Sequence, residues 1–358
     1  MNRIKKIVVK RLLQLKIQFA LISLIFSLSS CHVFWYNEHD TSPLQIFDSL
    51  WTSFYNTYAL FEVRGIDWHE TRKQFLPRIS HNMSSLELFQ VCAEMLNTLQ
   101  DPHVTLTAPF GNSFELIDNI PDHFFSLQRI RNEYLIDRGR TAADGRILYG
   151  KIRPDRTHNN VGYIHFMDFH IGDVFSTNWI NEFDSIIKSF SGTDFLIVDV
   201  RNSLGGFSVN MKFIASRFIA HKSDFLKIRT KNGPQRNDFS DPVTMTIHPA
   251  DIRYTNPIVL LTNNETVSAA EWFVLALKTQ RHVTHAGETT RGALSVRVTR
   301  NLTNGWRYSL SIQKITDMNG RNFEGIGISP NREHTLGNFD DSPLRNQDRQ
   351  LEYALTLH

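Results

Sequence analysis

Residues 260–271 read LLTNNETVSAAE, so an apolar strand leads through a polar loop to Ser268 and then into a helix of small and apolar residues. A serine at such a turn exposes its hydroxyl at the helix N-terminus, where backbone N–H groups and the helix dipole can stabilise an oxyanion. Serine is also a common N-cap residue. The segment alone therefore leaves open whether Ser268 reacts or only caps the helix.

The sequence on both sides of this segment predicts an α/β fold. Three short apolar runs alternate with three helical patterns: the runs cover 161–166, 195–200 and 258–262, and the helices cover 175–190, 208–220 and 268–279. This alternation indicates a mostly parallel sheet with covering helices. Residues 293–315 alternate apolar and polar side chains, which predicts antiparallel strands. Upstream, helices that start at Ser42-Pro43, Asp67 and Ser84 predict an N-terminal helical subdomain.

The first thirty residues have the composition of an export signal. They hold six of the 39 basic residues and no acid, and end in an apolar run, 17–30, that is too short to span a bilayer. The run closes as LSSC, which resembles a bacterial lipobox, so we expect 1–30 to be a lipoprotein signal peptide, Cys31 the lipidation site and 31–41 a tether. Without 1–30 the formal charge changes from +3 to −3, which argues against a nucleic-acid partner. The other cysteine, Cys92, falls on the apolar side of a helix and is expected to be a buried, inert thiol.

Three further segments hold residues that could take part in chemistry. Residues 199–206, DVRNSLGG, follow an apolar strand, and paired glycines there permit close backbone approach to a ligand, although such pairs usually form tight turns. His103 follows a helix end in the segment DPH, where a lone histidine is more often an ordinary surface or core residue. Glu324 begins EGIGISPN, a loop in which a solvated carboxylate is the simpler interpretation.

Taken in order, these segments resemble the motifs of peptidase family S41, which includes the C-terminal processing peptidases, the tricorn protease core and the photoreceptor retinoid-binding protein. The matching segments are DPH at 101–103, DVRNSLGG at 199–206, TVSAAE at 266–271, GETTRG at 287–292 and EGIGISPN at 324–331. The resemblance implies a crotonase/ClpP-like catalytic domain at 107–358, preceded by the helical subdomain at 42–106.

The resemblance also implies a catalytic design. Processing peptidases use a serine–lysine dyad, but the lysine position is Ala293 here, and neither Lys278 nor Lys314 lies in a matching motif. The tricorn-like branch uses a histidine and a glutamate, whose positions match His103 and Glu324.

On this design Ser268 is the nucleophile, His103 the base and Glu324 the acid that orients or polarises it. Gly206 and Ala269 supply the oxyanion-hole N–H groups, next to Gly205. The tricorn pattern has a serine before the histidine, which Pro102 replaces here, so Asp101 is an alternative to Glu324 for orienting His103.

The expected function is that of a serine endopeptidase acting on exported peptides or unfolded protein tails, in a lipoprotein of the cell envelope. Only 54 residues, 107–160, separate the histidine segment from the next strand, too few for the PDZ domain of many relatives. The sequence predicts no cofactor and no metal, since His282 and His285 would point to different faces of a strand, and it assigns no oligomeric state. The alternative is a non-catalytic ligand- or peptide-binding lipoprotein on the same scaffold, with some of the 26 phenylalanines lining an apolar pocket.

Overall fold

The three apolar runs lie side by side in a six-stranded sheet in the computed structural model, which describes residues 41–115, 125–156, 159–172, 178–336 and 347–358. The strand order is β10-β9-β6-β5-β4-β3, and the pairs among the first four strands are parallel. The strands are β3 (Arg140–Ala142), β4 (Ile147–Lys151), β5 (Val161–Phe166), β6 (Phe195–Asp199), β9 (Ile258–Thr262) and β10 (Val283–Gly287). Every residue of β5, β6 and β9 is buried, as expected for strands covered on both faces. The predicted α/β fold is therefore confirmed.

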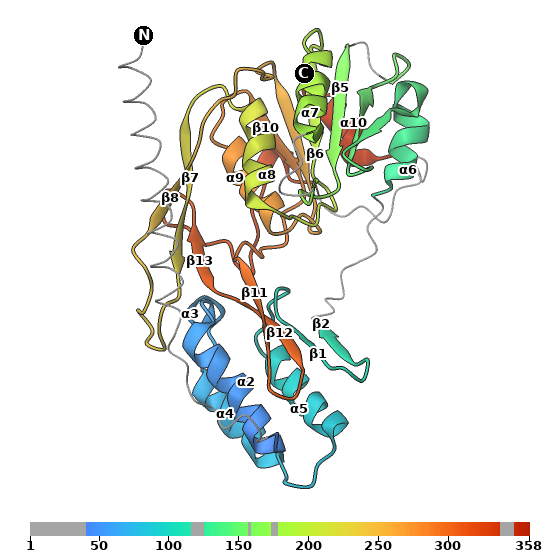
Figure 1. Ribbon diagram of the computed structural model, residues 1–358. Coiled ribbons are helices and arrows are strands. Elements are labelled where there is room, and N and C mark those ends of the chain that lie inside the picture. Colours follow the sequence, from blue (N-terminus) through green and yellow to red (C-terminus); the bar gives the residue numbers. More distant parts are fainter. Residues whose placement is uncertain (1–40, 116–124, 157–158, 173–177, 337–346) are drawn as a thin grey trace, which may run out of the picture. The chain divides into compact units, whose positions relative to one another are not determined.

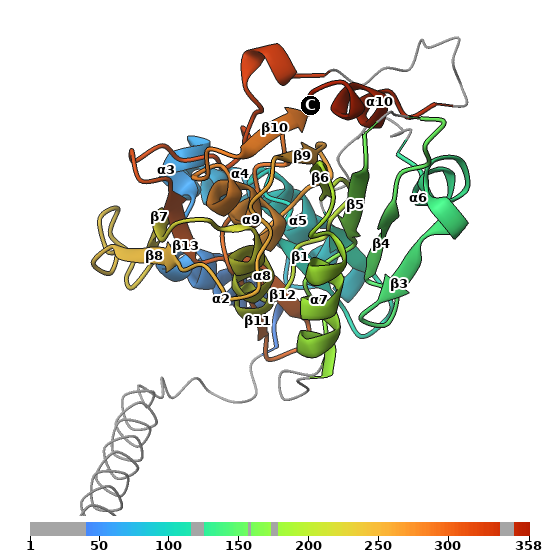
Figure 2. The same cartoon turned by 90° about the horizontal axis from the view of Figure 1, so that it is seen from above.

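Helices cover both faces of this sheet (Figures 1 and 2). One face packs against α7 (Asn178–Ser189), α8 (Ser208–Ala215) and α9 (Ala269–Leu277). The other packs against α10 (Arg349–Leu355) and the short helical turns α6 (Leu127–Arg129) and η2 (Ile130–Tyr134). The helix predicted to run to residue 220 ends at Ala215 and continues as a 3-10 turn, Ser216–Phe218.

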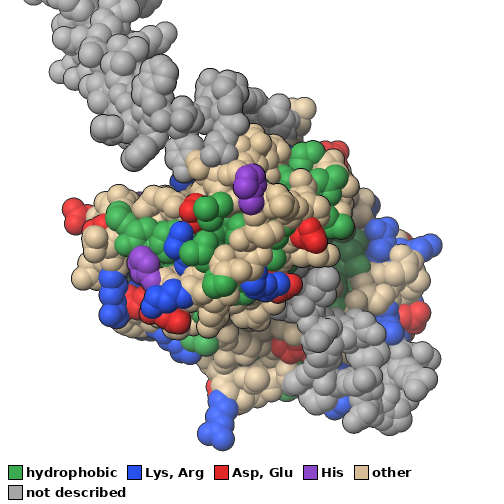
Figure 3. Space-filling model, turned by 90° about the horizontal axis from the view of Figure 1, so that it is seen from below, with side chains coloured by type: hydrophobic (Ala, Val, Ile, Leu, Met, Phe, Trp, Pro, Cys, Tyr) green, Lys and Arg blue, Asp and Glu red, His purple; other side chains and the backbone are tan. Residues whose placement is uncertain are grey.

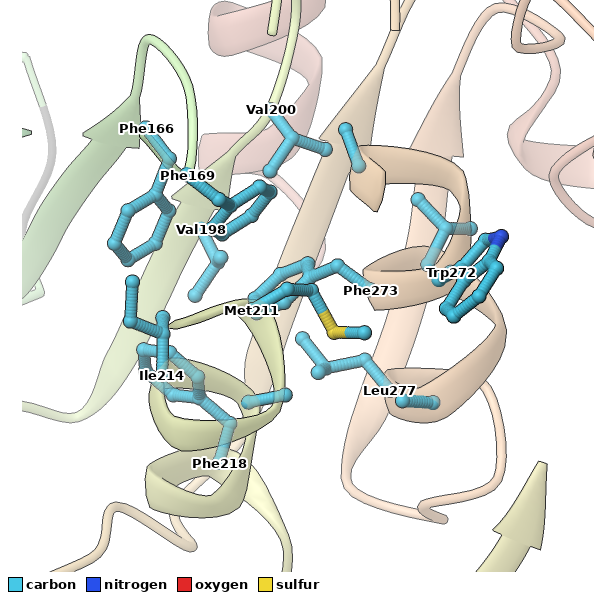
Figure 4. Packing of buried hydrophobic residues seen from close by; sticks show 14 of the residues in the cluster. Phe166, Phe169, Val198, Val200, Met211, Ile214, Phe218, Trp272, Phe273 and Leu277 are labelled. Carbon is cyan, nitrogen blue, oxygen red and sulfur yellow. The ribbon is translucent and has the colours of Figure 1, made fainter. Parts of the chain in front are cut away.

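Aromatic rings fill the space between the sheet and α8 and α9 (Figure 4). The ring centroids of Phe166 and Phe169 are 5.8 Å apart, and those of Phe169 and Phe273 are 5.5 Å apart. All three side chains are fully buried. These phenylalanines pack against one another as core residues, and Phe169 carries this packing to the loop that contains Gly205 and Gly206.

The N-terminal helices begin where the sequence predicts. They are α2 (Pro43–Thr57), α3 (Phe61–Arg64), α4 (Trp68–Phe75), the 3-10 turn η1 (Leu76–Arg78) and α5 (Ser85–Asn97). Ser42 and Asp67 accept hydrogen bonds from backbone N–H groups of α2 and α4, and Ser84 forms a capping box with Glu87.

The helical part shares its core with a second, antiparallel sheet of order β11-β12-β1-β2. Its strands are β11 (Arg297–Asn301), β12 (Arg307–Ser311), β1 (Thr105–Thr107) and β2 (Ser113–Glu115), and a third sheet contains β13 (Gln313–Thr316), β7 (Ser223–Thr230) and β8 (Val243–Ile247). The antiparallel strands predicted within 293–315 are confirmed. The boundary predicted after Leu106 falls inside β1, which pairs with β12.

Cys92 lies in the core of the helical part, and burial raises the pKa of its thiol to about 12, which keeps the thiol protonated. Basic and acidic side chains are interspersed on the face shown in Figure 3. Within the described ranges, no helix has the length and apolar character needed to cross a bilayer. The predicted signal, the tether through residue 40 and Cys31 lie outside the described residues.

Candidate active site

Ser268 stands at the turn between β9 and α9 in an unusual backbone conformation. Its φ is +60° and its ψ is −124°, in a region that residues with a side chain rarely adopt. Ser268 occupies the N-cap position, and its N–H donates to the carboxylate of Glu271 at N3 (3.1 Å). Strained conformations of this kind are concentrated at functional sites, so the conformation favours a reacting Ser268 over a simple cap.

The glycine loop after β6 is bonded directly to the loop that carries Ser268. Asn263 accepts a hydrogen bond from the Asn202 N–H (2.9 Å), and the Val267 N–H donates to the Ser203 carbonyl (3.1 Å). The two loops come together because β6 and β9 are parallel neighbours, whose carboxyl ends lie at the same edge of the sheet.

Gly205 and Gly206 are positions where a side chain would collide with neighbouring residues, at the Ser268 turn for Gly205 and at the Phe169 backbone for Gly206. A Cβ at Gly205, whose φ is +76°, would lie 2.7 Å from the Ser268 Cβ and 2.9 Å from the Ala269 N. A Cβ at Gly206, whose φ is +134°, would lie 2.7 Å from the Phe169 carbonyl carbon. Neither the Gly206 N–H nor the Ala269 N–H donates a hydrogen bond to an acceptor in the described residues. These two N–H groups therefore keep the capacity that an oxyanion hole needs.

Glu271, one turn into α9, anchors the backbone around Ser268. Its buried carboxylate accepts hydrogen bonds from the N–H groups of Ser268 (3.1 Å), Gly292 (2.7 Å) and Ala293 (2.8 Å), and from the Thr290 hydroxyl (2.6 Å). Burial raises the pKa of Glu271 to about 7, although the four hydrogen bonds that its carboxylate accepts lower this pKa. The serine turn and the GETTRG segment thus share one acceptor.

His103 lies between α5 and β1 with its backbone held on both sides. Its N–H donates to Asp101 Oδ1 (2.9 Å), and its carbonyl accepts from Ser309 Oγ (2.6 Å). The side chain is buried, and Nδ1 has no hydrogen-bond partner in the described part of the chain. Burial lowers the pKa of His103 below its ordinary value, so the neutral imidazole required of a base is favoured at neutral pH.

Two buried acids meet beside His103. Asp101 Oδ2 accepts from the Tyr58 hydroxyl (3.0 Å), and Arg64 Nη2 lies 3.9 Å from Asp101 Oδ1 and 3.6 Å from Glu324 Oε2. Glu324 Oε1 accepts the Ser295 N–H. Burial, reinforced by the charges of Asp101 and Glu271, raises the pKa of Glu324 well above its ordinary value.

The residues implied by the resemblance gather around these loops, but the hydrogen bonds of a triad are not formed. Among the described residues, His103 has no hydrogen bond to Ser268, and neither Glu324 nor Asp101 bonds its ring. Arg291 connects the two regions, since its N–H donates to the Thr266 carbonyl (3.0 Å) and its charge lowers the pKa of His103. Catalytic hydrogen bonds often tighten only when the substrate binds, and the roles assigned from the sequence stay predictions.

The two lysines that lie outside the matching motifs, Lys278 and Lys314, have other partners. Lys278 lies at the C-terminal end of α9, about 15 Å along the helix axis from Ser268, and its Nζ donates to the Ser329 carbonyl (3.1 Å). Lys314 pairs with Glu62. His285 bonds Thr262, whereas His282 bonds the Phe218 carbonyl, so the two histidines have separate partners.

Sequence reasoning missed three residues of this region. Glu271 stands in the TVSAAE segment at the spacing of a capping box, which was the available signal for its contact with the Ser268 N–H. Tyr58 and Arg64 gave no such signal, because their partner Asp101 lies more than thirty residues downstream.

An α/β fold with a serine at a strand-to-helix turn, beside backbone N–H groups without acceptors, is typical of hydrolases with a serine nucleophile. Residues 160–334 match the model of peptidase family S41, and residues 39–97 match the model of the tricorn protease C1 domain. The resemblance seen in the sequence is thereby confirmed, with the match to peptidase family S41 covering residues 160–334.

Individual relatives support this assignment. The chain is 25% identical to the carboxy-terminal processing protease CtpA of Bacillus subtilis (strain 168) over 191 residues, which are 53% of this chain and 38% of that protein. A putative peptidase from Parabacteroides merdae has a similar structure, with a TM-score of 0.76, 25% identity and coverage of 88% of this chain and 96% of that one. Mature CPAF complexed with lactacystin shares the fold, with a TM-score of 0.62, 15% identity and coverage of 82% and 93%. The match to the Bacillus protein therefore spans well under half of that relative's length.

Replacement of Gly205 by alanine is expected to lower the free energy of unfolding by about 2–4 kcal/mol, the sum of left-handed strain and overpacking. Gly320→Ala is the matched control, because Gly320 has a φ of +83° and open space where a Cβ would lie. It should cost only about 1 kcal/mol. Urea unfolding of both variants measures the difference, and equal losses would contradict the close approach at Ser268.

Glu271→Gln is expected to lower the free energy of unfolding by about 3 kcal/mol, because an amide turned either way presents its NH₂ to two of the four donors. The control is Glu182→Gln, since Glu182 is an exposed residue that accepts a single hydrogen bond, from the Ala143 N–H. That variant should stay within about 0.5 kcal/mol of the parent. Thermal unfolding compares the two, and a tolerated Glu271→Gln would show that the carboxylate is dispensable.

Proposed function

We propose that the protein is a serine peptidase in which Ser268 forms an acyl-enzyme. The observation that carries the proposal is the positive φ of Ser268 beside the N–H groups of Gly206 and Ala269, which donate to no acceptor among the described residues. His103 takes the proton of the Ser268 hydroxyl as Oγ attacks the peptide carbonyl, and the two N–H groups hold the oxyanion. The imidazolium then protonates the leaving amine, and water hydrolyses the ester by the same route.

In this mechanism the acids beside His103 stabilise the imidazolium that forms when His103 accepts the proton. Asp101 is the stronger candidate, because its charge raises the pKa of His103 whereas burial lowers it. Glu324 is joined to the same group through Arg64. With Pro102 in place of the relay serine, a contact between Glu324 and the ring would require a rearrangement in the substrate complex.

The substrate class we propose is a peptide or an unfolded protein tail. The family assignment implies a peptide substrate. Exposed apolar side chains adjoin the glycine loop: Leu204 is 62% exposed and Phe207 is 43% exposed. These side chains suit an extended chain with apolar residues. A binding protein without catalysis is less favoured, because Phe166, Phe169 and Phe273 are occupied with one another in the core.

The test of this mechanism is labelling with a biotinylated fluorophosphonate. Ser268→Ala should abolish labelling, and His103→Ala should slow it by about 10²–10⁴-fold, as expected when a general base is lost. Lys278→Ala and Lys314→Ala serve as controls and should be labelled at the parental rate. The parent, and not Ser268→Ala, should also cleave members of a peptide library. Labelling that survives Ser268→Ala, or that depends on a lysine and not on His103, refutes the mechanism.

We also propose that the protein is exported and held at the cell envelope by lipid on Cys31. The support is the basic start and the apolar run that ends in LSSC. Intact-mass measurement of membrane-extracted protein should give a chain that starts at Cys31 and carries acyl groups. A Cys31→Ala variant should leave the membrane fraction, and equal membrane retention of this variant would remove the lipid-anchor proposal.

A further inference from the structure

Arg64 joins the two segments that carry His103 and Glu324. It is the last residue of α3, and its side chain is only 9% exposed. Its Nη1 donates to the Gln100 carbonyl, and its Nη2 lies 3.9 Å from Asp101 Oδ1 and 3.6 Å from Glu324 Oε2. One guanidinium from the helical part of the chain therefore contacts the loop before His103 and the buried acid opposite it.

The contact with Gln100 bears on the position of His103. Gln100 has a φ of +50°, a left-handed conformation that costs free energy for a residue with a side chain. Its carbonyl is fixed by Arg64, and the turn that follows is closed by the Val104 N–H, which donates to the Asp101 carbonyl (2.9 Å). Arg64 thus holds the start of the turn that presents the His103 ring.

The contact of Arg64 with Asp101 and Glu324 places a positive charge beside two buried acids. Asp101 and Glu324 are both buried, and Arg64 is the cation within ion-pair distance of both in the described part of the chain. A buried carboxylate without a cation nearby is costly. The other groups that act on this cluster are Tyr58 and Glu271, while the charges of Arg291 and Arg297 act on His103.

We propose that Arg64 is a positioning residue of the candidate active site, which fixes the loop of His103 through Gln100 and places a positive charge beside the buried carboxyl groups of Asp101 and Glu324. The proposal rests on the proposed function, since it assigns Arg64 a role in the reactivity of Ser268. It also makes the helical part of the chain a component of the site.

Loss of the Arg64 charge has a defined effect on His103. The positive charge of Arg64 lowers the pKa of His103, and the negative charge of Asp101 raises it. Without Arg64 this lowering effect is lost and the raising effect of Asp101 remains, so the pKa of His103 rises. A base must be neutral to accept a proton, so the acidic limb of the acylation rate moves to higher pH.

The experiment compares Arg64→Met, Arg64→Lys and the control Arg72→Met by the pH dependence of fluorophosphonate acylation. Arg72 lies in the same helical part and pairs with Asp48 (2.8 Å), which is not a residue of the candidate active site. Arg64→Met should acylate about 10- to 100-fold more slowly, with its acidic limb about 0.5–1 pH unit higher. Arg64→Lys keeps the charge but cannot reach all three acceptors. Its acylation should therefore be slower than that of the parent, while the acidic limb of its pH profile stays at the parental pH. Arg72→Met should match the parent in both.

A second measurement separates this proposal from the proposed function. The pKa of His103 is followed by NMR of histidine-labelled protein, with its signal assigned from its loss in His103→Gln. If the parent is never acylated, the proposed function fails, while a raised pKa of His103 in Arg64→Met still supports the contact. An unchanged rate, limb and His103 pKa in that variant would overturn the proposal. If Arg64→Met does not fold, Arg64→Lys decides, because parental kinetics in that variant would equally refute a positioning role.

Discussion

Four hydrogen bonds converge on the buried carboxylate of Glu271, and the geometry around Ser268 follows from them. The carboxylate fixes the first turn of α9 and the segment 290–293, which in turn packs against the loop of Glu324. In that contact the Gly325 N–H donates to the Gly292 carbonyl (2.8 Å), and a Cβ at Gly327 would strike the Thr290 carbonyl. Such a carboxylate tolerates burial only because every donor around it is used, so three motif segments depend on one side chain.

Much of the fold could be predicted from the sequence, since strands buried on both faces are continuous apolar runs and the helix starts carry ordinary caps. The segments around Ser268, Gly205 and Glu324 were also found, because their residue order matches a known pattern. The contacts of Tyr58 and Arg64 could not be predicted in this way. Tyr58 directly follows α2 and Arg64 ends α3, where the sequence indicates packing alone, and their partner Asp101 is brought near only by the tertiary fold.

The helical part and the parallel sheet contribute to the same site by different means. The sheet supplies the loop ends on which Ser268 and Gly205 lie, and the cluster of Phe166, Phe169 and Phe273 holds those loops from beneath. The helical part supplies polar side chains that reach the loop of His103. The antiparallel strand β12 links the helical core to the loop of His103, because Ser309 donates to the His103 carbonyl while its neighbours pack in the helical core.

The spread of these residues along the chain also sets the order in which the site can form during synthesis. Tyr58 and Arg64 leave the ribosome first, the Asp101 loop follows, Ser268 emerges much later and Glu324 comes last. Domains fold as their segments become available, so a growing chain has Ser268 before it has the acid that completes the buried cluster. Because these residues lie far apart in sequence, the complete site forms only late in synthesis. Until then an unfinished chain lacks the full site while its own segments are still unfolded.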